Sequence, residues 1–263
     1  MTEYTTLLVA IDGPVARVTI NRPDKLNALN PTVIAELTRA FQTLENNADV
    51  RVAILLGAGE KAFVAGADIG VMAGMNSEQA RAFASQGHSL GDAIESAHFP
   101  VIAQIHGFAL GGGCEIACAC DLVYASEKAR FGQPEVGLGV IPGFGGTQRL
   151  TRRVGPGKAR ELIFRGNVID AKTAGDIGLA DNVFPHDQLD AEVRKIADEI
   201  ARQAPLAVAQ AKRTMRAGSD VPLSVANHLE IQAFGVCFGT DDQKNGMKAF
   251  LENPRAARTF TGK

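Results

Sequence analysis

The sequence predicts an α/β fold that ends in a purely helical part. Short β-branched and apolar runs alternate with helical patterns through roughly the first 180 residues. After residue 187 only helical spacing remains, as in Leu189, Val193 and Ile196. A chain of 263 residues is long enough to bury about 70–75% of its unfolded surface without disulfide support. We therefore expect an α/β core over 1–195 and a helical region over 196–263.

A β-hairpin and a helix are expected first. Residues 7–11 and 15–20 are alternating β-branched runs, and Asp12-Gly13-Pro14 between them has the composition of a tight turn. Asn30-Pro31 then offers an N-cap followed by proline at the first helical position. Apolar residues continue at helical spacing, so this helix has one buried face; they are Ile34, Leu37, Phe41 and Leu44.

The core strands follow. Three short, continuous apolar runs, at 52–56, 101–105 and 122–125, predict strands buried on both faces of a sheet. Helical patterns lie between them, over 77–96 and after Gly111. This alternation is typical of α/β proteins.

Charge and cysteine content exclude several classes of protein. The 27 Lys and Arg against 29 Asp and Glu leave a formal net charge of −2, so a nucleic-acid partner is not expected. Four cysteines are too few for a disulfide scaffold, which favours a reducing compartment. The cluster Cys114, Cys118 and Cys120 lacks a second ligand pair at zinc spacing, so no metal site is expected.

Targeting and membrane signals are weak. Residues 1–10 contain no basic leader segment. The uncharged stretch Ser96 to Cys114 is interrupted by Pro100 and four glycines, so it does not resemble a membrane span. We expect a cytoplasmic protein without a membrane partner.

Two short motifs suggest other enzymes. Gly57-Ala-Gly59-Glu-Lys-Ala62 matches a dinucleotide-binding fingerprint but is not followed by the long helix that this fingerprint requires. Gly87-His-Ser89-Leu-Gly91 matches the nucleophile elbow of serine hydrolases. Ser89 lies in a helical pattern rather than between a strand and a helix, so the hydrolase is the less favoured alternative.

The most unusual block is a strand followed by Gly111-Gly112-Gly113 and a helix with Glu115 in its first turn. Glycines let the backbone approach a ligand closely, and a helix N-terminus presents N–H groups that have no helical partner. This arrangement suits the stabilisation of an oxyanion. Equally, the glycines could serve only tight packing, with Glu115 stabilised by the helix dipole.

Two other segments suggest acid–base chemistry. The small-residue loop 63–69 could supply a second N–H donor from Ala67. Glu135 follows Pro134 in an apolar setting, which would raise the pKa of its carboxyl group. An exposed loop glutamate is the alternative interpretation. A pair formed by Glu115 and Glu135 would suit proton transfer next to a carbonyl group.

Five motifs, in order along the chain, resemble the crotonase (enoyl-CoA hydratase/isomerase) superfamily, and short-chain enoyl-CoA hydratases most closely. The likeness extends along essentially the whole chain. The motifs are Asn21-Arg-Pro-Asp-Lys25-Leu-Asn-Ala-Leu29, Lys61-Ala-Phe-Val-Ala-Gly-Ala-Asp-Ile69, His106-Gly-Phe-Ala-Leu-Gly-Gly-Gly-Cys-Glu115, Phe131-Gly-Gln-Pro-Glu135 and Ile141-Pro-Gly-Phe-Gly-Gly-Thr-Gln-Arg-Leu150.

The resemblance implies a fold, an assembly and a reaction. The fold would be a spiral of ββα units with C-terminal helices that form a homotrimer or a hexamer. The backbone N–H groups of Ala67 and Gly112 would form the oxyanion hole, and Glu115 and Glu135 would be catalytic. The reaction would be reversible syn addition of water to trans-2-enoyl-CoA, without a metal or a separate cofactor. Within the family, a Δ3,Δ2-enoyl-CoA isomerase or a hydratase of a branched substrate such as methylglutaconyl-CoA is the alternative.

The resemblance also implies where coenzyme A binds, with Phe250 reaching the adenine from a neighbouring subunit. Many hydratases have lysine at the positions of Gly70 and Asn253, so the phosphate contacts are expected to differ here. The implied substrate-binding residues are Lys25, Ala28, Ala65, Asp68, Ile69, Gly70, Gly111, Pro134 and Phe250.

Overall fold

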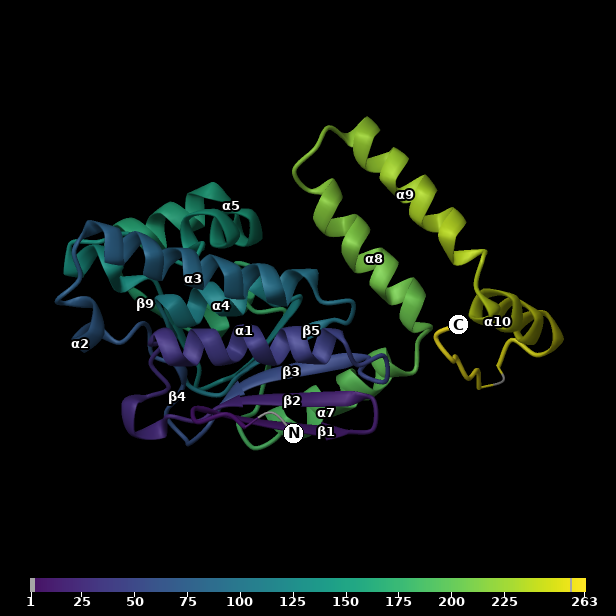
Figure 1. Ribbon diagram of the computed structural model, residues 1–263, viewed down its shortest axis with the longest axis horizontal. Coiled ribbons are helices and arrows are strands. Elements are labelled where there is room, and N and C mark those ends of the chain that lie inside the picture. Colours follow the sequence, from purple (N-terminus) through teal and green to yellow (C-terminus); the bar gives the residue numbers. More distant parts are fainter. Residues whose placement is uncertain (1–2, 256) are drawn as a thin grey trace.

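The computed structural model describes residues 3–255 and 257–263. Figure 1 shows strands packed against helices, with a separate group of helices at the C-terminal end. The larger sheet has six strands in the spatial order β1-β2-β3-β5-β7-β10. Their bounds are β1 Leu7–Asp12, β2 Val15–Ile20, β3 Val52–Gly57, β5 Val101–Ile105, β7 Leu122–Ser126 and β10 Asn182–Phe184.

The hairpin and the buried core strands are confirmed. β1 and β2 pair antiparallel from Leu7 opposite Ile20 to Asp12 opposite Val15. The remaining neighbours, β2–β3, β3–β5, β5–β7 and β7–β10, pair in parallel. Every residue of β5 is buried, as expected for a central strand of a parallel sheet covered on both faces.

A second sheet of three-residue strands lies beside the first, and the local sequence patterns did not indicate these strands. Its order is β4-β6-β8-β9, with only the β8–β9 pair antiparallel. Each of β4, β6 and β8 directly follows a strand of the large sheet, so the chain repeats a ββ pattern before its helices. The expected ββα units are therefore present. The strands are β4 Ala62–Val64, β6 Phe108–Leu110, β8 Arg130–Gly132 and β9 Val168–Asp170.

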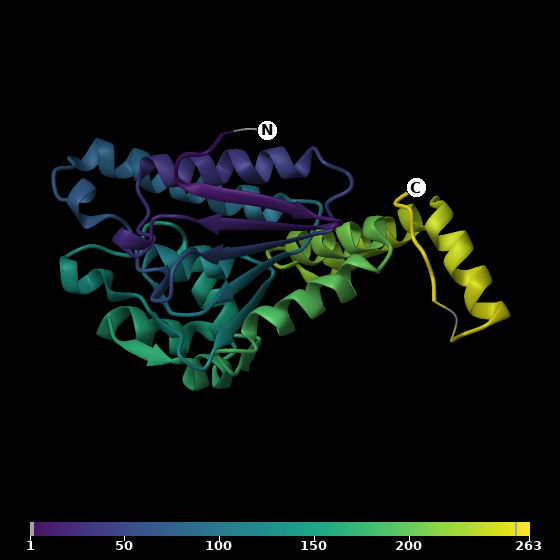
Figure 2. The same ribbon diagram turned by 90° about the horizontal axis from the view of Figure 1, so that it is seen from below.

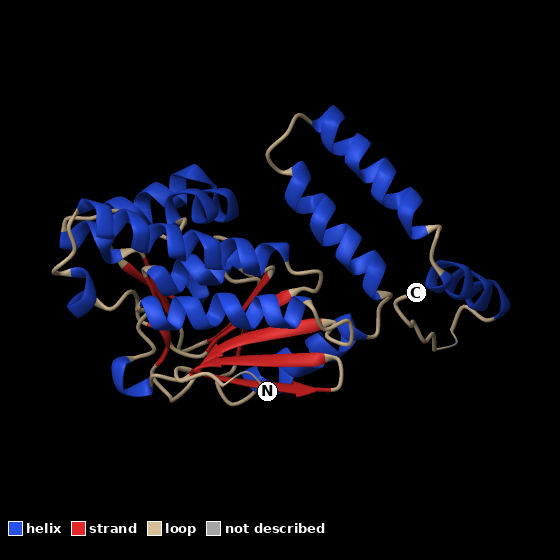
Figure 3. Cartoon of the chain, in the orientation of Figure 1, coloured by secondary structure: helices blue, strands red, loops and turns tan. Residues whose placement is uncertain are grey.

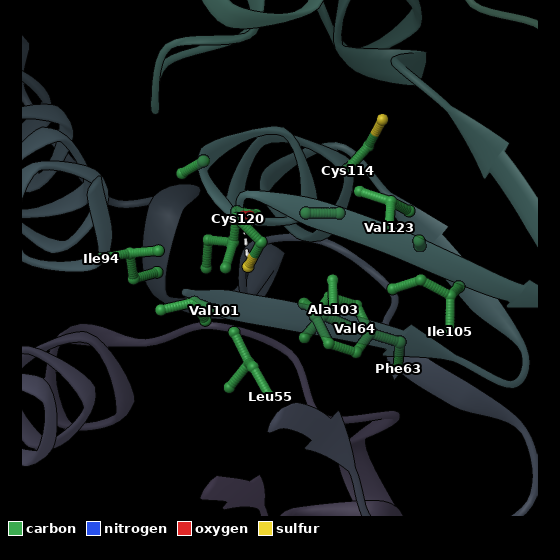
Figure 4. Close-up of a cluster of buried hydrophobic side chains, with 14 of the residues drawn as sticks. Leu55, Phe63, Val64, Ile94, Val101, Ala103, Ile105, Cys114, Cys120 and Val123 are labelled. Carbon is green, nitrogen blue, oxygen red and sulfur yellow. Dashed lines mark hydrogen bonds between the residues drawn. The ribbon is translucent and has the colours of Figure 1, made fainter. Parts of the chain in front are cut away.

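Helices cover both faces of the large sheet (Figure 3). The main core lies under α1, α3 and α4, and Figure 4 shows part of it, where Phe63, Val64 and Cys114 approach strands β5 and β7. On the opposite face, α7 packs Val193 and Ala197 against Val52. The α-helices are α1 Pro31–Glu45, α2 Ile69–Met72, α3 Ser77–Ser96, α4 Gly112–Ala119, α5 Gly146–Arg165, α6 Ala171–Asp176, α7 Leu189–Ala201, α8 Pro205–Gly218, α9 Leu223–Cys237 and α10 Asp241–Glu252.

The last three helices extend away from the sheets (Figures 1 and 2). α8 is attached to the core by Lys212, whose buried Nζ donates to the carbonyl of Phe99 at 2.9 Å and lies 2.8 Å from Asp121. The proposed boundary at residue 196 falls inside α7, and that helix still packs on the sheet through Ala201. The division into two regions stays a prediction, with the projecting part beginning at α8.

No helix among the described residues is both long enough and apolar enough to cross a membrane. The uncharged stretch from Ser96 to Cys114 is divided between the end of α3, the strands β5 and β6, and the first turn of α4. Pro100 and Gly107 lie between these elements, so the stretch is not one continuous helix.

Candidate active site

A cavity of about 410 Å³ opens where the loop after β4, the start of α4 and the segment after β8 meet. That last segment contains a short 3₁₀ helix, η2 Pro134–Leu138. The two sheets bring these segments together because β4, β6 and β8 are adjacent parallel strands whose carboxyl ends share one edge. The cavity is lined by Ala65, Gly66, Ala67, Ile69, Met72, Met75, Ala80, Phe83, Ala84, Gly111, Gly112, Glu115, Pro134, Glu135, Leu138, Val140, Ile141, Gly143 and Phe144.

Two backbone N–H groups are available at this cavity. A parallel bridge joins Leu29 to Ala67 through the N–H of Leu29, which donates to Gly66, and the N–H of Asp68, which donates to Leu29. This pairing leaves the N–H of Ala67 outside the bridge. Gly112 is the first residue of α4, where an N–H has no helical acceptor. Two donors that line one cavity can hold a single oxyanion.

The glycines before α4 serve both packing and access. A Cβ on Gly113 would lie 2.2 Å from the carbonyl oxygen of Val64, so this glycine is required for packing. Gly111 has φ +50°, and a Cβ there would lie 2.8 Å from the Glu135 carboxylate. The packing interpretation of the glycine block therefore holds at Gly113, and the ligand-binding interpretation stays a prediction.

Glu115 is buried, at 2% exposure, and its carboxylate is held from one side. Oε1 accepts the N–H of Phe144 at 2.7 Å and the N–H of Gly146 at 2.6 Å. Gly146 is the first residue of α5, so the carboxylate also lies at the positive end of that helix. Burial raises the pKa of Glu115, while these two N–H bonds and the charge of Arg149 lower it.

Glu135 lines the same cavity and belongs to η2. Burial raises its pKa to about 7, and the charge of Glu115 acts in the same direction. The buried Gln133 amide faces this carboxyl, and with its nitrogen turned toward Glu135 it donates to both oxygens, at 2.9 and 3.1 Å. The two carboxyl groups thus differ in environment, which is the arrangement of an acid–base pair.

The far wall of the cavity is apolar and compact. Phe83 of α3 and Phe144 meet edge to face, with ring centroids 5.1 Å apart. Gly87 makes room for this contact, since a Cβ there would lie 2.1 Å from the Phe144 ring. An apolar ligand of limited length fits such a space.

The structure brings together some of the expected substrate-binding residues. Ala65, Ile69, Gly111 and Pro134 line the cavity beside both carboxylates. Asp68 and the carbonyl of Ala28 instead bind Arg22, at 3.3 and 2.5 Å. Lys25 ends the short 3₁₀ helix η1 Pro23–Lys25, and Gly70 is the second residue of α2. Phe250 is on α10, where it lines a different cavity and stacks with Arg258.

The weaker motifs have structural roles. Ser89 is inside α3, where its hydroxyl donates to the carbonyl of Ser85 at 3.0 Å. It is not at a strand–helix turn, so the serine-hydrolase alternative has no support. Gly57 ends β3, and a Cβ there would lie 2.3 Å from the carbonyl of Phe63. No cluster of metal-binding side chains was found among the described residues.

Sequence reasoning missed the groups that hold Glu115. Phe144, Gly146 and Arg149 all belong to the segment 141–150, whose side chains do not by themselves indicate a contact with Glu115. Its glycines are the one available signal, because Gly145 has φ +107° and precedes α5. The direction of the backbone N–H groups depends on this turn and cannot be read from side-chain types.

Comparison with known proteins gives a consistent result. A family model described as enoyl-CoA hydratase/isomerase matches residues 10–261. The short-chain-enoyl-CoA hydratase of Clostridium acetobutylicum is 48% identical over 250 residues, covering 95% of this chain and 96% of that protein. The crotonyl-CoA hydratase of Syntrophomonas wolfei is 44% identical over 253 residues, covering 96% and 97%. An enoyl-CoA hydratase structure from Bacillus anthracis superposes with a TM-score of 0.95 at 39% identity, covering 98% and 100%.

Proposed function

We propose that this chain, which belongs to the enoyl-CoA hydratase/isomerase family, is a hydratase that adds water to short trans-2-enoyl-CoA thioesters. The observation that supports this most is the pair Glu115 and Glu135, which face one apolar cavity beside two available N–H groups. The direct test is loss of the conjugated-enoyl absorbance of crotonyl-CoA, with 3-hydroxybutyryl-CoA identified as the product. Unchanged absorbance with pure protein would contradict the proposal.

The N–H groups of Ala67 and Gly112 bind the thioester oxygen in this mechanism. Attack of water at C3 moves the electrons of the C2–C3 double bond onto that oxygen and forms an enolate. Fixed N–H donors stabilise this charge more strongly than they stabilise the neutral thioester, which is the condition for catalysis. Because the donors are held by the bridge at Leu29 and by α4, they require little reorganisation.

The two glutamates divide the proton transfers. Glu115 accepts one proton from water as the oxygen bonds to C3, and Glu135 delivers one proton to C2 as the enolate collapses. The pair begins and ends with one proton in total, and the net change is the addition of one water. Both carboxyls line the same cavity, so both can reach the reacting carbons of one bound substrate.

Hydration is favoured over isomerisation by the presence of both carboxyl groups. An isomerase must move one proton between carbons, for which a single acid–base group suffices. Here the second carboxylate, Glu115, is held by two N–H groups and shares the cavity with Glu135. Burying the Glu115 carboxylate costs free energy, and its use as the base that activates a water molecule gives a reason for that cost.

We further propose that the substrate's CoA part lies along Ala65 to Gly70 and the Lys25 segment, and that Phe250 reaches it from another copy of the chain. In its own subunit, Phe250 is on the projecting α10 and does not line the cavity that holds Glu115. A neighbouring subunit that packs on these helices would bring such a group close.

All four cysteines are free thiols, which fits a reducing compartment such as the cytoplasm.

Raising the pH through about 7 should lower kcat/KM for crotonyl-CoA. Glu135 must hold a proton to deliver it to C2, and its pKa is about 7; a carboxylic acid loses its proton as the pH rises through its pKa. In the active form, Glu115 and Glu135 together hold one proton. Loss of that proton at high pH should therefore lower the rate of the reverse reaction, dehydration, as well. Rates measured between about pH 5 and about pH 9 should show this limb in the wild type and not in Glu135→Gln. A wild-type profile that is flat through neutrality would contradict this role.

A charge placed on α9 should prevent assembly into a trimer or a hexamer. No residue of α9 is buried, although much of the helix is apolar; Ile231 is 64% and Phe234 65% exposed. Such a surface is typical of an interface between subunits. Phe234→Asp should shift the molar mass from light scattering to that of a monomer. Leu8→Asp puts the same charge on a residue of β1 that is 56% exposed, and should leave the mass unchanged. A monomeric wild type would refute the proposed assembly.

A further inference from the structure

We propose that Arg149 is a positioning residue for Glu115: its guanidinium fixes the turn whose N–H groups hold the Glu115 carboxylate. This inference rests on the proposed role of Glu115 as the base that activates water. Arg149 does not line the cavity and touches no reacting atom. It acts on the turn between Gly143 and Gly146, which separates the cavity from α5.

The contact is made at the centre of the turn. Arg149 Nη1 donates to the carbonyl oxygen of Phe144 at 3.1 Å. That carbonyl belongs to the peptide between residues 144 and 145. The peptides on either side carry the two N–H groups, of Phe144 and Gly146, that donate to Glu115. Rotation of the central peptide would turn both donors away, because peptide groups are planar and linked at each Cα.

The guanidinium is itself held rigidly by α3. Its Nε and Nη2 donate to the two oxygens of Glu95, at 2.6 and 3.1 Å, as a fork. Asp92 lies 3.4 Å from Nη2. Arg216 of α8 binds the same Glu95 carboxylate at 3.1 Å, so the acid is shared with the projecting helices.

Two glycines leave the space in which this guanidinium lies. A Cβ on Gly91 of α3 would lie 2.7 Å from Arg149 Nη2, and a Cβ on Gly145 would lie 2.3 Å from Nη1. The Arg149 side chain is only 13% exposed. A long cation in a slot between two glycines, with both ends of its fork bonded, has one available position, which is what positioning requires.

The test compares Arg149→Met with Arg153→Met in the hydration of crotonyl-CoA. Arg153 is a matched control on the same helix: it is 15% exposed, donates to the carbonyl of Leu179 at 2.9 Å and binds Asp181 at 2.6 Å. Both variants lose a carbonyl contact and the ion pairs of a mostly buried arginine, those with Glu95 and Asp92 in one case and that with Asp181 in the other, so both should lose thermal stability. Only Arg149 contacts the turn at Glu115.

Arg149→Met should lower kcat by on the order of tenfold to a hundredfold, the effect expected from a small misplacement of a reacting group. KM should change much less. The acid limb of kcat/KM, the fall in rate as Glu115 becomes protonated at low pH, should move to higher pH. The charge of Arg149 lowers the pKa of Glu115, so its loss lets that carboxyl take up a proton at higher pH. Glu115 also faces Glu135, whose charge is the other one close to it. Arg153→Met should keep the wild-type kcat and acid limb.

Arg149→Lys separates charge from geometry. Lysine keeps the cation but lacks the fork, so it should restore the acid limb and only part of kcat. Equal loss of kcat in Arg149→Met and Arg153→Met, with no movement of the limb, would overturn the inference. If Arg149→Met does not fold, a wild-type kcat in Arg149→Lys would overturn it. Wild-type protein that does not hydrate crotonyl-CoA would instead refute the proposed function.

Discussion

Replacing Glu115 or Glu135 with glutamine should lower kcat for crotonyl-CoA hydration by about a hundredfold or more, the range of general acid–base catalysis. The change removes the ability to accept or deliver a proton and preserves the shape of the side chain. In Glu115→Gln, the amide oxygen can still accept the N–H groups of Phe144 and Gly146. The turn should therefore stay in place, and the loss of rate reports on the proton transfer.

The double variant distinguishes a pair from two independent groups. If both glutamates act in one proton-transfer sequence, the double variant should be little slower than the slower single variant, because groups that act together are not additive. Losses that multiply would show that the two carboxyl groups act separately. The rates are measured with crotonyl-CoA above KM, so that binding does not contribute.

Glu36→Gln is the matched control for these variants. Glu36 is also a buried glutamate, at 7% exposure, and accepts the backbone N–H groups of Thr5 and Thr6 at 2.9 and 2.8 Å. It does not line the cavity. Its replacement should leave kcat unchanged and lower the midpoint of thermal unfolding. A fall in kcat similar to that of Glu115→Gln would mean that loss of any buried carboxylate impairs the protein.

The large sheet and its helices could be predicted because their signals are local. Residues 52–57 form a short continuous apolar run, which is typical of a strand covered on both faces. Asn30 caps α1 as expected, accepting the N–H of Val33 at 2.9 Å. The strands β4, β6, β8 and β9 could not be found in this way, because three residues are too few to show a period. Their pairing depends on close approaches such as Gly107 to the carbonyl of Lys61.

The candidate site was predictable to a different degree at each residue. Glu115 and Glu135 stand out as carboxylates in apolar, glycine-rich segments, and both line the cavity. Their unlike environments depend on tertiary structure, since Glu115 is held by a turn that is distant in sequence. Arg149 has the sequence character of an ordinary charged residue on a helix. Its role becomes visible only when Glu95 and Phe144 are seen on either side of its guanidinium.

Substituting proline for Gly112 should lower kcat by about a hundredfold to a thousandfold, the usual effect of removing one oxyanion donor. Proline has no N–H, and the first position of a helix is where it is best tolerated. The preceding residue is Gly111, which lacks the Cβ that would otherwise clash with a proline ring. α4 should therefore form, and the main chemical change is the loss of one donor at the cavity.

Gly112→Ala is the control that keeps the N–H group. A Cβ at this position would lie 3.0 Å from Leu29 and 3.1 Å from Phe144, so alanine reports on the crowding that proline also introduces. The carbonyl stretching frequency of bound butyryl-CoA gives an independent measure, because each N–H donor that polarises the thioester lowers it. Alanine should retain that shift and most of kcat, whereas proline should lose both. If the two variants have equal kcat and equal carbonyl frequencies, the N–H of Gly112 does not bind the thioester oxygen, and the negative charge must be stabilised elsewhere in the cavity.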